Sequence, residues 1–141
     1  MSACTFFGHR YAKSEIIPLL SSVIDELITK CGVKRFYVGT HGDFDWMVWD
    51  ILSEKKKCYD IEVLMVLCYM PKPGAFFPEG TKTVLPEGIE TVYPKNAIIF
   101  RNNWMIDNSD YVVTYVEYNS NGAGRFKRIA ERKNKTVINI K

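Results

Sequence analysis

Short runs of β-branched and aromatic residues alternate along this chain with longer amphipathic stretches, and this alternation limits the fold more than any other feature. The runs expected to form strands are Cys4–Phe7, Arg35–Val38, Ile61–Leu67, Tyr111–Val116 and Thr136–Ile140. The run at 61–67 is apolar apart from Glu62, which is typical of a strand buried on both faces of a parallel sheet. The pattern predicts a doubly wound α/β fold: a mainly parallel, five-stranded, Rossmann-like sheet with helices on both faces.

Four stretches between these strands have apolar residues at helical spacing. The expected helices cover about 15–31, 44–57, 96–107 and 125–133. Ser14 and Asp43 stand where the first two begin and are expected to cap them. Residues 70–95 hold five of the six prolines, so we expect an irregular excursion there. That excursion is expected either to cover a pocket as a lid or to meet another subunit through Phe76 and Phe77.

Length and composition favour a single globular domain over residues 1–141, with 47% hydrophobic and 25% charged residues. No run of about 18 apolar residues is present, so neither a membrane span nor a membrane partner is expected, and we expect a cytoplasmic location. The cysteines lack Cys-x-x-Cys spacing and are expected to be buried free thiols: Cys4, Cys31, Cys58 and Cys68. A net charge of +3 permits an anionic ligand but does not favour nucleic acid as a partner.

Three glycine-bearing turns follow strands or precede helices, and right-handed crossovers would bring the turns to one edge of the sheet. Gly8, His9 and Arg10 follow the first strand, where glycine permits close approach and Arg10 offers a fork that matches a phosphate. The turns at 39–43 and 121–124 each open a helix, whose amino terminus favours an anion. The alternative at each position is a plain turn without a ligand.

Two further segments carry candidate binding residues. Asp45 lies one residue off the apolar stripe of its helix, where it could accept hydrogen bonds from sugar hydroxyls. Arg101, Trp104 and Asp107 are spaced at i, i+3 and i+6 in a stretch too polar for a core helix, and are expected to form a wall of the site. The alternative is that Arg101 pairs with Asp107 or Asp110 and ties the helix to the sheet.

Several well-known catalytic and cofactor motifs are missing from the chain. It has no Gly-x-x-x-x-Gly-Lys-Ser/Thr, no complete Gly-x-Gly-x-x-Gly after a strand and no Gly-x-Ser-x-Gly. Its two histidines, His9 and His41, lack the spacing of a metal site. We therefore expect no metal and no cofactor.

Taken together, these segments resemble the SLOG superfamily, which includes DprA and the LOG enzymes, and are most similar to its YpsA-like branch. The resemblance is carried by Phe7–Arg10, Gly42–Asp45, Arg101–Asp107 with Ser109 and Asp110, and Asn121–Gly124 with Arg128–Ala130. It implies a Rossmann-like fold and a pocket for a nucleotide-derived ligand. LOG enzymes carry Pro-Gly-Gly-x-Gly-Thr-x-x-Glu, and this chain has Arg125 and Arg128 in place of the Thr and Glu, so LOG activity is not implied.

The sequence therefore predicts a non-catalytic or weakly catalytic module that binds a nucleotide-like small molecule, with Trp104 or Trp46 stacking on the base. The residues expected to bind the ligand are Gly8, His9, Arg10, Gly39, Thr40, Gly42, Asp45, Arg101, Trp104, Asp107, Gly122 and Gly124. One alternative is an N-glycosidic hydrolase or transferase acting on nucleoside monophosphates, with Asp45 or Asp107 as the carboxylate. A second is DprA-like binding of single-stranded DNA. The sequence leaves open whether the protein forms a homo-oligomer.

Overall fold

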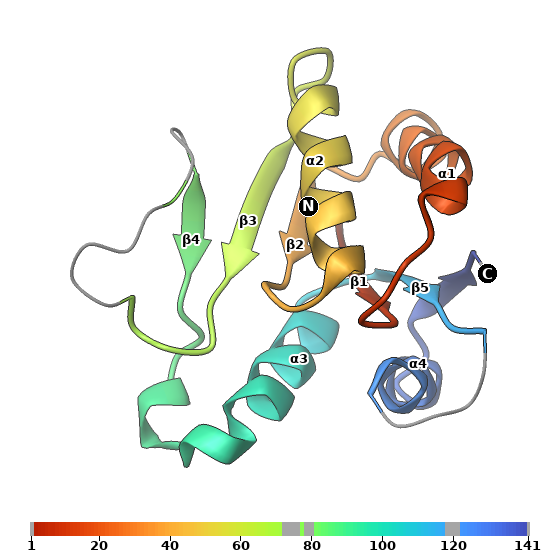
Figure 1. Cartoon of the computed structure of the whole chain (residues 1–141). Coiled ribbons are helices and arrows are strands. Elements are labelled where there is room, and N and C mark those ends of the chain that lie inside the picture. The colour runs from red at the N-terminus through yellow and green to blue at the C-terminus, as the bar shows by residue number, and fades with distance from the viewer. Residues whose placement is uncertain (1, 72–76, 78–80, 118–121, 141) are drawn as a thin grey trace.

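The computed structural model describes residues 2–71, 77, 81–117 and 122–140. In this part of the chain a six-stranded, all-parallel sheet forms the centre of the molecule (Figure 1). The strands are β1 (Ala3–Gly8), β2 (Arg35–Val38), β3 (Glu62–Val66), β4 (Lys82–Val84), β5 (Tyr111–Tyr115) and β6 (Thr136–Asn139). Their spatial order is β4-β3-β2-β1-β5-β6. The predicted α/β class is confirmed, with one strand more than expected.

Helices cover both faces of the sheet, because side chains of the central strands alternate between two cores. On β1, Cys4 and Phe6 belong to one core, whereas Ala3 and Phe7 belong to the other. The first core is completed by α1 (Ile17–Thr29) and α2 (Asp43–Lys55), and the second by α3 (Ala97–Asp107) and α4 (Ala123–Arg132). No helix of the described residues is long and apolar enough to cross a membrane.

The order of the strands reverses direction at β1. From β1 the chain proceeds outward through β2, β3 and β4, and it then returns to place β5 on the other side of β1. In the β1–β5 pair Gly8 lies opposite Tyr115, and the N–H of His9 donates to the carbonyl oxygen of Tyr115 at 3.2 Å. A doubly wound sheet opens a crevice at such a reversal, at the carboxyl ends of the strands. Here that crevice begins after Gly8 and Tyr115.

Residues 70–95 are more regular than predicted. They contain β4, the short 3-10 helix η2 (Ile89–Thr91) and the start of a second one, η3 (Pro94–Asn96). β4 pairs in parallel with β3, and Leu64 lies opposite Lys82. Its short length and exposed Lys82 and Thr83 are typical of an edge strand, which leaves little hydrophobic pattern to detect. The predicted lid or interface falls partly outside the described residues, at 72–76 and 78–80, and Phe76 lies in this part.

Both predicted helix caps are wrong in detail. Ser14 starts a 3-10 helix, η1 (Ser14–Ile16), which runs into α1, and its side chain caps neither helix. Asp43 is the first residue of α2, and the cap position is taken by Gly42 with φ of 88°. The N–H of Asp43 instead donates to the carbonyl oxygen of Arg10 at 2.7 Å, which ties the loop after β1 to the start of α2.

The four cysteines are free thiols, as predicted, but they are not all buried. Cys4 and Cys68 lie in the interior, whereas Cys31 and Cys58 are exposed. Cys31 follows the end of α1 and Cys58 follows the end of α2. Both stand in turns after a helix, where the apolar spacing used to place buried residues no longer applies.

Candidate functional site

A pocket of about 500 Å³ opens at the reversal of strand order, within the range typical of small-molecule sites. Four segments far apart in the sequence line it: the end of β1, the start of α2, one face of α3 and the start of α4. Polar residues of this lining are His9, Arg10, His41, Asp45, Arg101 and Asn102. The edge of the sheet predicted to gather the glycine turns thus carries the pocket.

Arg101 is the most unusual residue of the pocket, because its charged side chain is only 2% exposed. Its Nε donates to Asn102 Oδ1 at 3.0 Å, and its Nη1 donates to Thr40 Oγ1 at 3.2 Å and to the carbonyl oxygen of Val66 at 3.4 Å. No described residue accepts a hydrogen bond from Nη2. A buried cation normally requires a counter-charge and partners for all its donors. Arg101 therefore lines the pocket with one donor atom, Nη2, that is not bonded to any described residue.

Asp45 supplies the single buried carboxyl group among the described residues of the pocket lining, with 9% exposure. Its Oδ2 accepts a hydrogen bond from the backbone N–H of His41 at 2.9 Å. Burial raises the pKa of Asp45 to about 6, although the His41 N–H and the charge of Arg101 both act in the opposite direction. The carboxyl group can therefore gain or lose a proton near neutral pH.

Gly39, the residue after β2, lets these two side chains approach the backbone. A Cβ atom at this position would lie 2.8 Å from Asp45 Oδ2 and 3.4 Å from Cζ and Nη1 of Arg101. The first distance is too short for any side chain without displacement of the carboxyl group. Gly39 thus leaves room for Asp45 and Arg101, and Thr40 accepts a hydrogen bond from Arg101. Neither Gly39 nor Thr40 lines the pocket itself.

Two helices begin at the pocket, and neither start is capped by a side chain. The cap positions are Gly42, with φ of 88°, and Gly122, with φ of 77°. Both are left-handed conformations that favour glycine. The first N–H groups of a helix lack partners inside the helix, and they carry the positive end of its dipole. The start of α4 at Gly122 and Ala123 therefore presents donors suited to an anion.

His9 and His41 have different roles in the pocket. His9 is buried, and its Nε2 accepts a hydrogen bond from the N–H of Glu117 at 2.9 Å, which joins the ends of β1 and β5. The ring also packs edge-on against Tyr115. His41 is exposed as a whole residue, but its ring is partly desolvated, and this desolvation lowers its pKa together with the charges of Arg101 and Arg10. The lowered pKa favours the neutral form of the ring.

Besides Gly39 and Thr40, three predicted site residues lie away from the pocket lining. Trp104 packs edge-on against Tyr37, with ring centres 5.2 Å apart. Asp107 is exposed at the end of α3 and binds Lys133. Gly124 is buried within the first turn of α4. The Arg101–Asp107 pairing considered as an alternative is not formed, and Asp110 accepts a hydrogen bond from the N–H of Ala3 instead.

Sequence reasoning missed most of the α3 face that lines the pocket. This face consists of Ile98, Arg101, Asn102 and Met105. They are spaced at i, i+3, i+4 and i+7, which is the spacing of a single helical face. This spacing can be seen in the sequence, but it does not say which face of the helix meets the pocket, and the prediction rested on the i, i+3, i+6 pattern with Trp104 and Asp107.

A second hollow, of about 570 Å³, lies between α1 and α2 and has a different character. Its apolar walls include Ile17, Trp46, Met47 and Ile51, and three carboxylates and one lysine lie around them: Asp43, Asp50, Glu54 and Lys55. This acidic surrounding would repel an anion. Among the described residues, no three His, Cys, Asp or Glu side chains lie close enough together to hold a metal ion.

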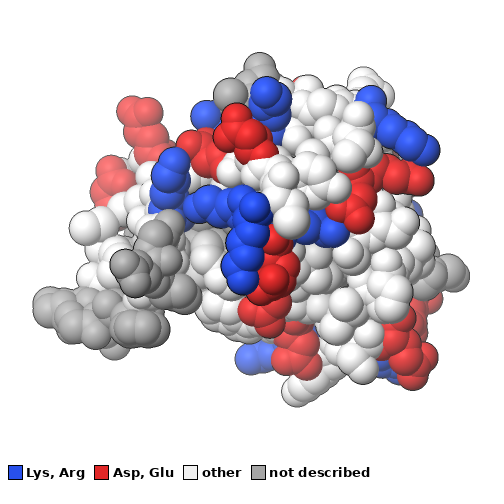
Figure 2. Space-filling model, turned by 90° about the horizontal axis from the view of Figure 1, so that it is seen from above, with Lys and Arg blue, Asp and Glu red and all other residues white. Residues whose placement is uncertain are grey.

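The end of the molecule at which the strands begin, opposite the pocket, carries mixed charges (Figure 2). At the starts of β2, β3 and β4, Glu62 pairs with Arg35 at 2.7 Å and with Lys82 at 3.4 Å. Among the described residues on this face, acidic side chains interrupt the basic ones. That arrangement differs from the continuous positive groove that follows a nucleic acid backbone.

Comparison with known proteins adds no relative: no family model matches the chain, and no curated protein is significantly similar to it in sequence.

Proposed function

We propose that the pocket binds a nucleotide-derived ligand composed of phosphate, ribose and base. The phosphate lies between Arg10, Arg101 and the first turn of α4, and the ribose hydroxyls donate to Asp45. The observation that carries this proposal is the buried guanidinium of Arg101, whose Nη2 has no acceptor among the described residues. An anionic ligand would supply the missing acceptor and a negative charge in addition to that of Asp45.

The chemistry of the remaining lining supports the same ligand class. Arg10 is exposed and lies at the rim, so it can close over an anion without a change of fold. The single carboxyl group, on Asp45, is an acceptor suited to vicinal hydroxyls. The resemblance to the SLOG superfamily supports the proposal as well, since each of its four segments contributes residues to this pocket: Gly8, Gly42, Arg101 and Gly122 are examples.

The test is isothermal titration with AMP of the wild-type protein and of Arg10→Ala and Arg101→Ala. Loss of a charge-assisted hydrogen bond typically weakens binding by about 10- to 100-fold. Arg132→Ala is the matched control, because Arg132 is exposed at the far end of α4. Arg101→Ala could unfold the protein, so the exposed Arg10 provides the second readout. Unchanged affinity in both pocket variants, or no binding by the wild type, would contradict the proposal.

A second function, cleavage of the N-glycosidic bond of a nucleoside monophosphate, is favoured by one observation. The pKa of Asp45 is raised to about 6 by burial, which suits a group that exchanges a proton near neutral pH. Asp107, the other carboxylate considered for this role, binds Lys133 outside the pocket. Release of free adenine from AMP should therefore disappear in Asp45→Asn and persist in Asp107→Asn. Release by both variants would indicate a contaminating enzyme.

A further inference from the structure

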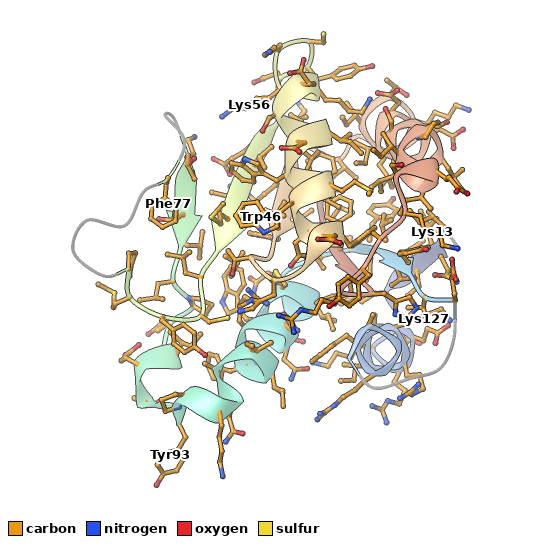
Figure 3. The ribbon with its side chains drawn as sticks, in the orientation of Figure 1. Lys13, Trp46, Lys56, Phe77, Tyr93 and Lys127 are labelled. Carbon is orange, nitrogen blue, oxygen red and sulfur yellow. The ribbon has the colours of Figure 1, made fainter. Side chains whose placement is uncertain are left out.

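A smaller cavity of about 320 Å³ lies beside the anion pocket, on the side of β3. It is lined by aromatic and apolar side chains, among them Trp46, Met65, Leu67, Tyr69 and Phe77. Trp46 is 46% exposed and Tyr69 is 50% exposed, so their rings are available to a ligand. Figure 3 shows Trp46 extending from α2 toward the side of β3, and Phe77 beside β4.

The cavity and the pocket meet at the turn after β2. His41 lines both of them. Thr40 lines the cavity, and its hydroxyl accepts a hydrogen bond from Nη1 of Arg101, which lines the pocket. Cys68 in the cavity is close enough to Arg101 and Asp45 for their charges to act on its pKa, which burial raises. The two spaces therefore adjoin, with only this turn between them.

The pocket is charged, whereas the adjoining cavity is apolar. The pocket contains Arg10, Asp45 and Arg101, whereas the described lining of the cavity has no Lys, Arg, Asp or Glu. A molecule that fills both would be ionic at one end and planar and apolar at the other. Trp104 does not compete for the planar end, because its ring is packed against Tyr37 in the core.

We propose that this cavity, defined by Trp46 and Tyr69, is the base subsite of the nucleotide ligand, and that the ligand passes His41 to reach it. The inference rests on the proposed function of the anion pocket. The protein should therefore bind nucleotides more tightly than sugar phosphates. A base that stacks on the indole ring of Trp46 adds affinity, and a sugar phosphate has no base.

The experiment compares AMP with ribose 5-phosphate as ligands of the wild type, Trp46→Ala and Trp46→Phe. The wild type should bind AMP about tenfold or more tightly than ribose 5-phosphate. Trp46→Ala should bind AMP no better than ribose 5-phosphate and should keep the wild-type affinity for ribose 5-phosphate. Trp46→Phe, which retains a ring, should recover most of the preference. Tyr93→Ala removes an aromatic side chain that is 76% exposed and lines neither space, and it serves as the matched control.

A second measurement follows the indole N–H signal of Trp46 by NMR, assigned through its loss in Trp46→Phe. AMP should shift this signal, and ribose 5-phosphate should leave it in place. If Trp46→Ala binds AMP as the wild type does, the base lies elsewhere and the inference fails while the function of the anion pocket stands. If neither probe binds the wild type, the proposed function fails and the inference fails with it.

Discussion

The carboxyl group of Asp45 and the guanidinium group of Arg101 lie against the same backbone position, Gly39, on which a Cβ would come within 2.8 Å of one and 3.4 Å of the other. Arg101 lowers the pKa of Asp45, and burial raises it by more. Among the described residues, Asp45 takes its hydrogen bond from His41 rather than from Arg101. The two opposite charges thus lie near each other in the interior, and each group can still form hydrogen bonds to a ligand.

Gly39→Ala should reduce ligand binding and stability together. The added methyl group would displace the Asp45 carboxyl group, and overpacking of this kind costs about 1–3 kcal/mol. Gly32→Ala is the control, because Gly32 has φ of 70° but open space around it. It should lower stability through backbone strain and leave AMP affinity unchanged. Urea unfolding and AMP titration of both variants measure the two effects, and equal binding by both would contradict the role of Gly39.

Asp45→Asn should stabilise the protein at neutral pH. Because the folded-state pKa of Asp45 is raised from 3.8 to about 6, its contribution to stability is fully present below the unfolded value and is lost as pH rises through about 6. A neutral amide removes this loss, with a gain of up to about 3 kcal/mol above that range. Urea unfolding between about pH 4 and pH 8 checks this. A variant less stable than the wild type at pH 8 would contradict it.

Gly8→Ala should strongly destabilise the protein, because a Cβ there would lie 2.4 Å from ring atoms of Phe44. Phe44 is 1% exposed and stacks on Tyr115, so its ring has little room to retreat. The smaller side chain in Phe44→Leu should relieve the clash. In a double-mutant cycle, the cost of Gly8→Ala should fall by about 1 kcal/mol or more when Phe44→Leu is present. Additive effects would show that the clash is relieved in another way.

The thiols should react at widely different rates with a disulfide reagent. Cys31 and Cys58 are exposed and should react first. Cys4 is fully buried, and its burial raises its pKa far above the ordinary value, so it should react only after unfolding. Mass spectrometry of peptides after timed labelling separates the sites. Early labelling of Cys4 would indicate that the first strand opens readily.

The alternation of strands and helices was sufficient to predict the fold class, because parallel strands need helical crossovers and these leave a clear period in the sequence. The same reasoning placed the turns that contain Gly8, Gly39 and Gly122 at one edge of the sheet. It missed β4, since three residues with an exposed Lys82 and Thr83 carry almost no pattern. Such a short edge strand forms because it pairs with the neighbouring strand, here β3, and that pairing cannot be seen in the sequence of the short strand.

The error on α3 has a geometric cause. Residues six positions apart on a helix differ by about 120° in direction, and here Arg101 faces the pocket whereas Asp107 pairs with Lys133 outside it. Met105, four positions after Arg101, does face it. Which side of α3 would meet the pocket depended on which face of the sheet the helix covers, and the pattern of polar residues did not contain that information.

The contact between Arg10 and the start of α2 involves backbone atoms. The N–H of Asp43 binds the carbonyl oxygen of Arg10, and a Cβ on Gly42 would lie 3.0 Å from the Cα of Arg10. The path of the loop is therefore independent of which side chain stands at position 10. Protein engineers, or evolution, could exchange that side chain and change the charge at the mouth of the pocket while the architecture around it stays the same.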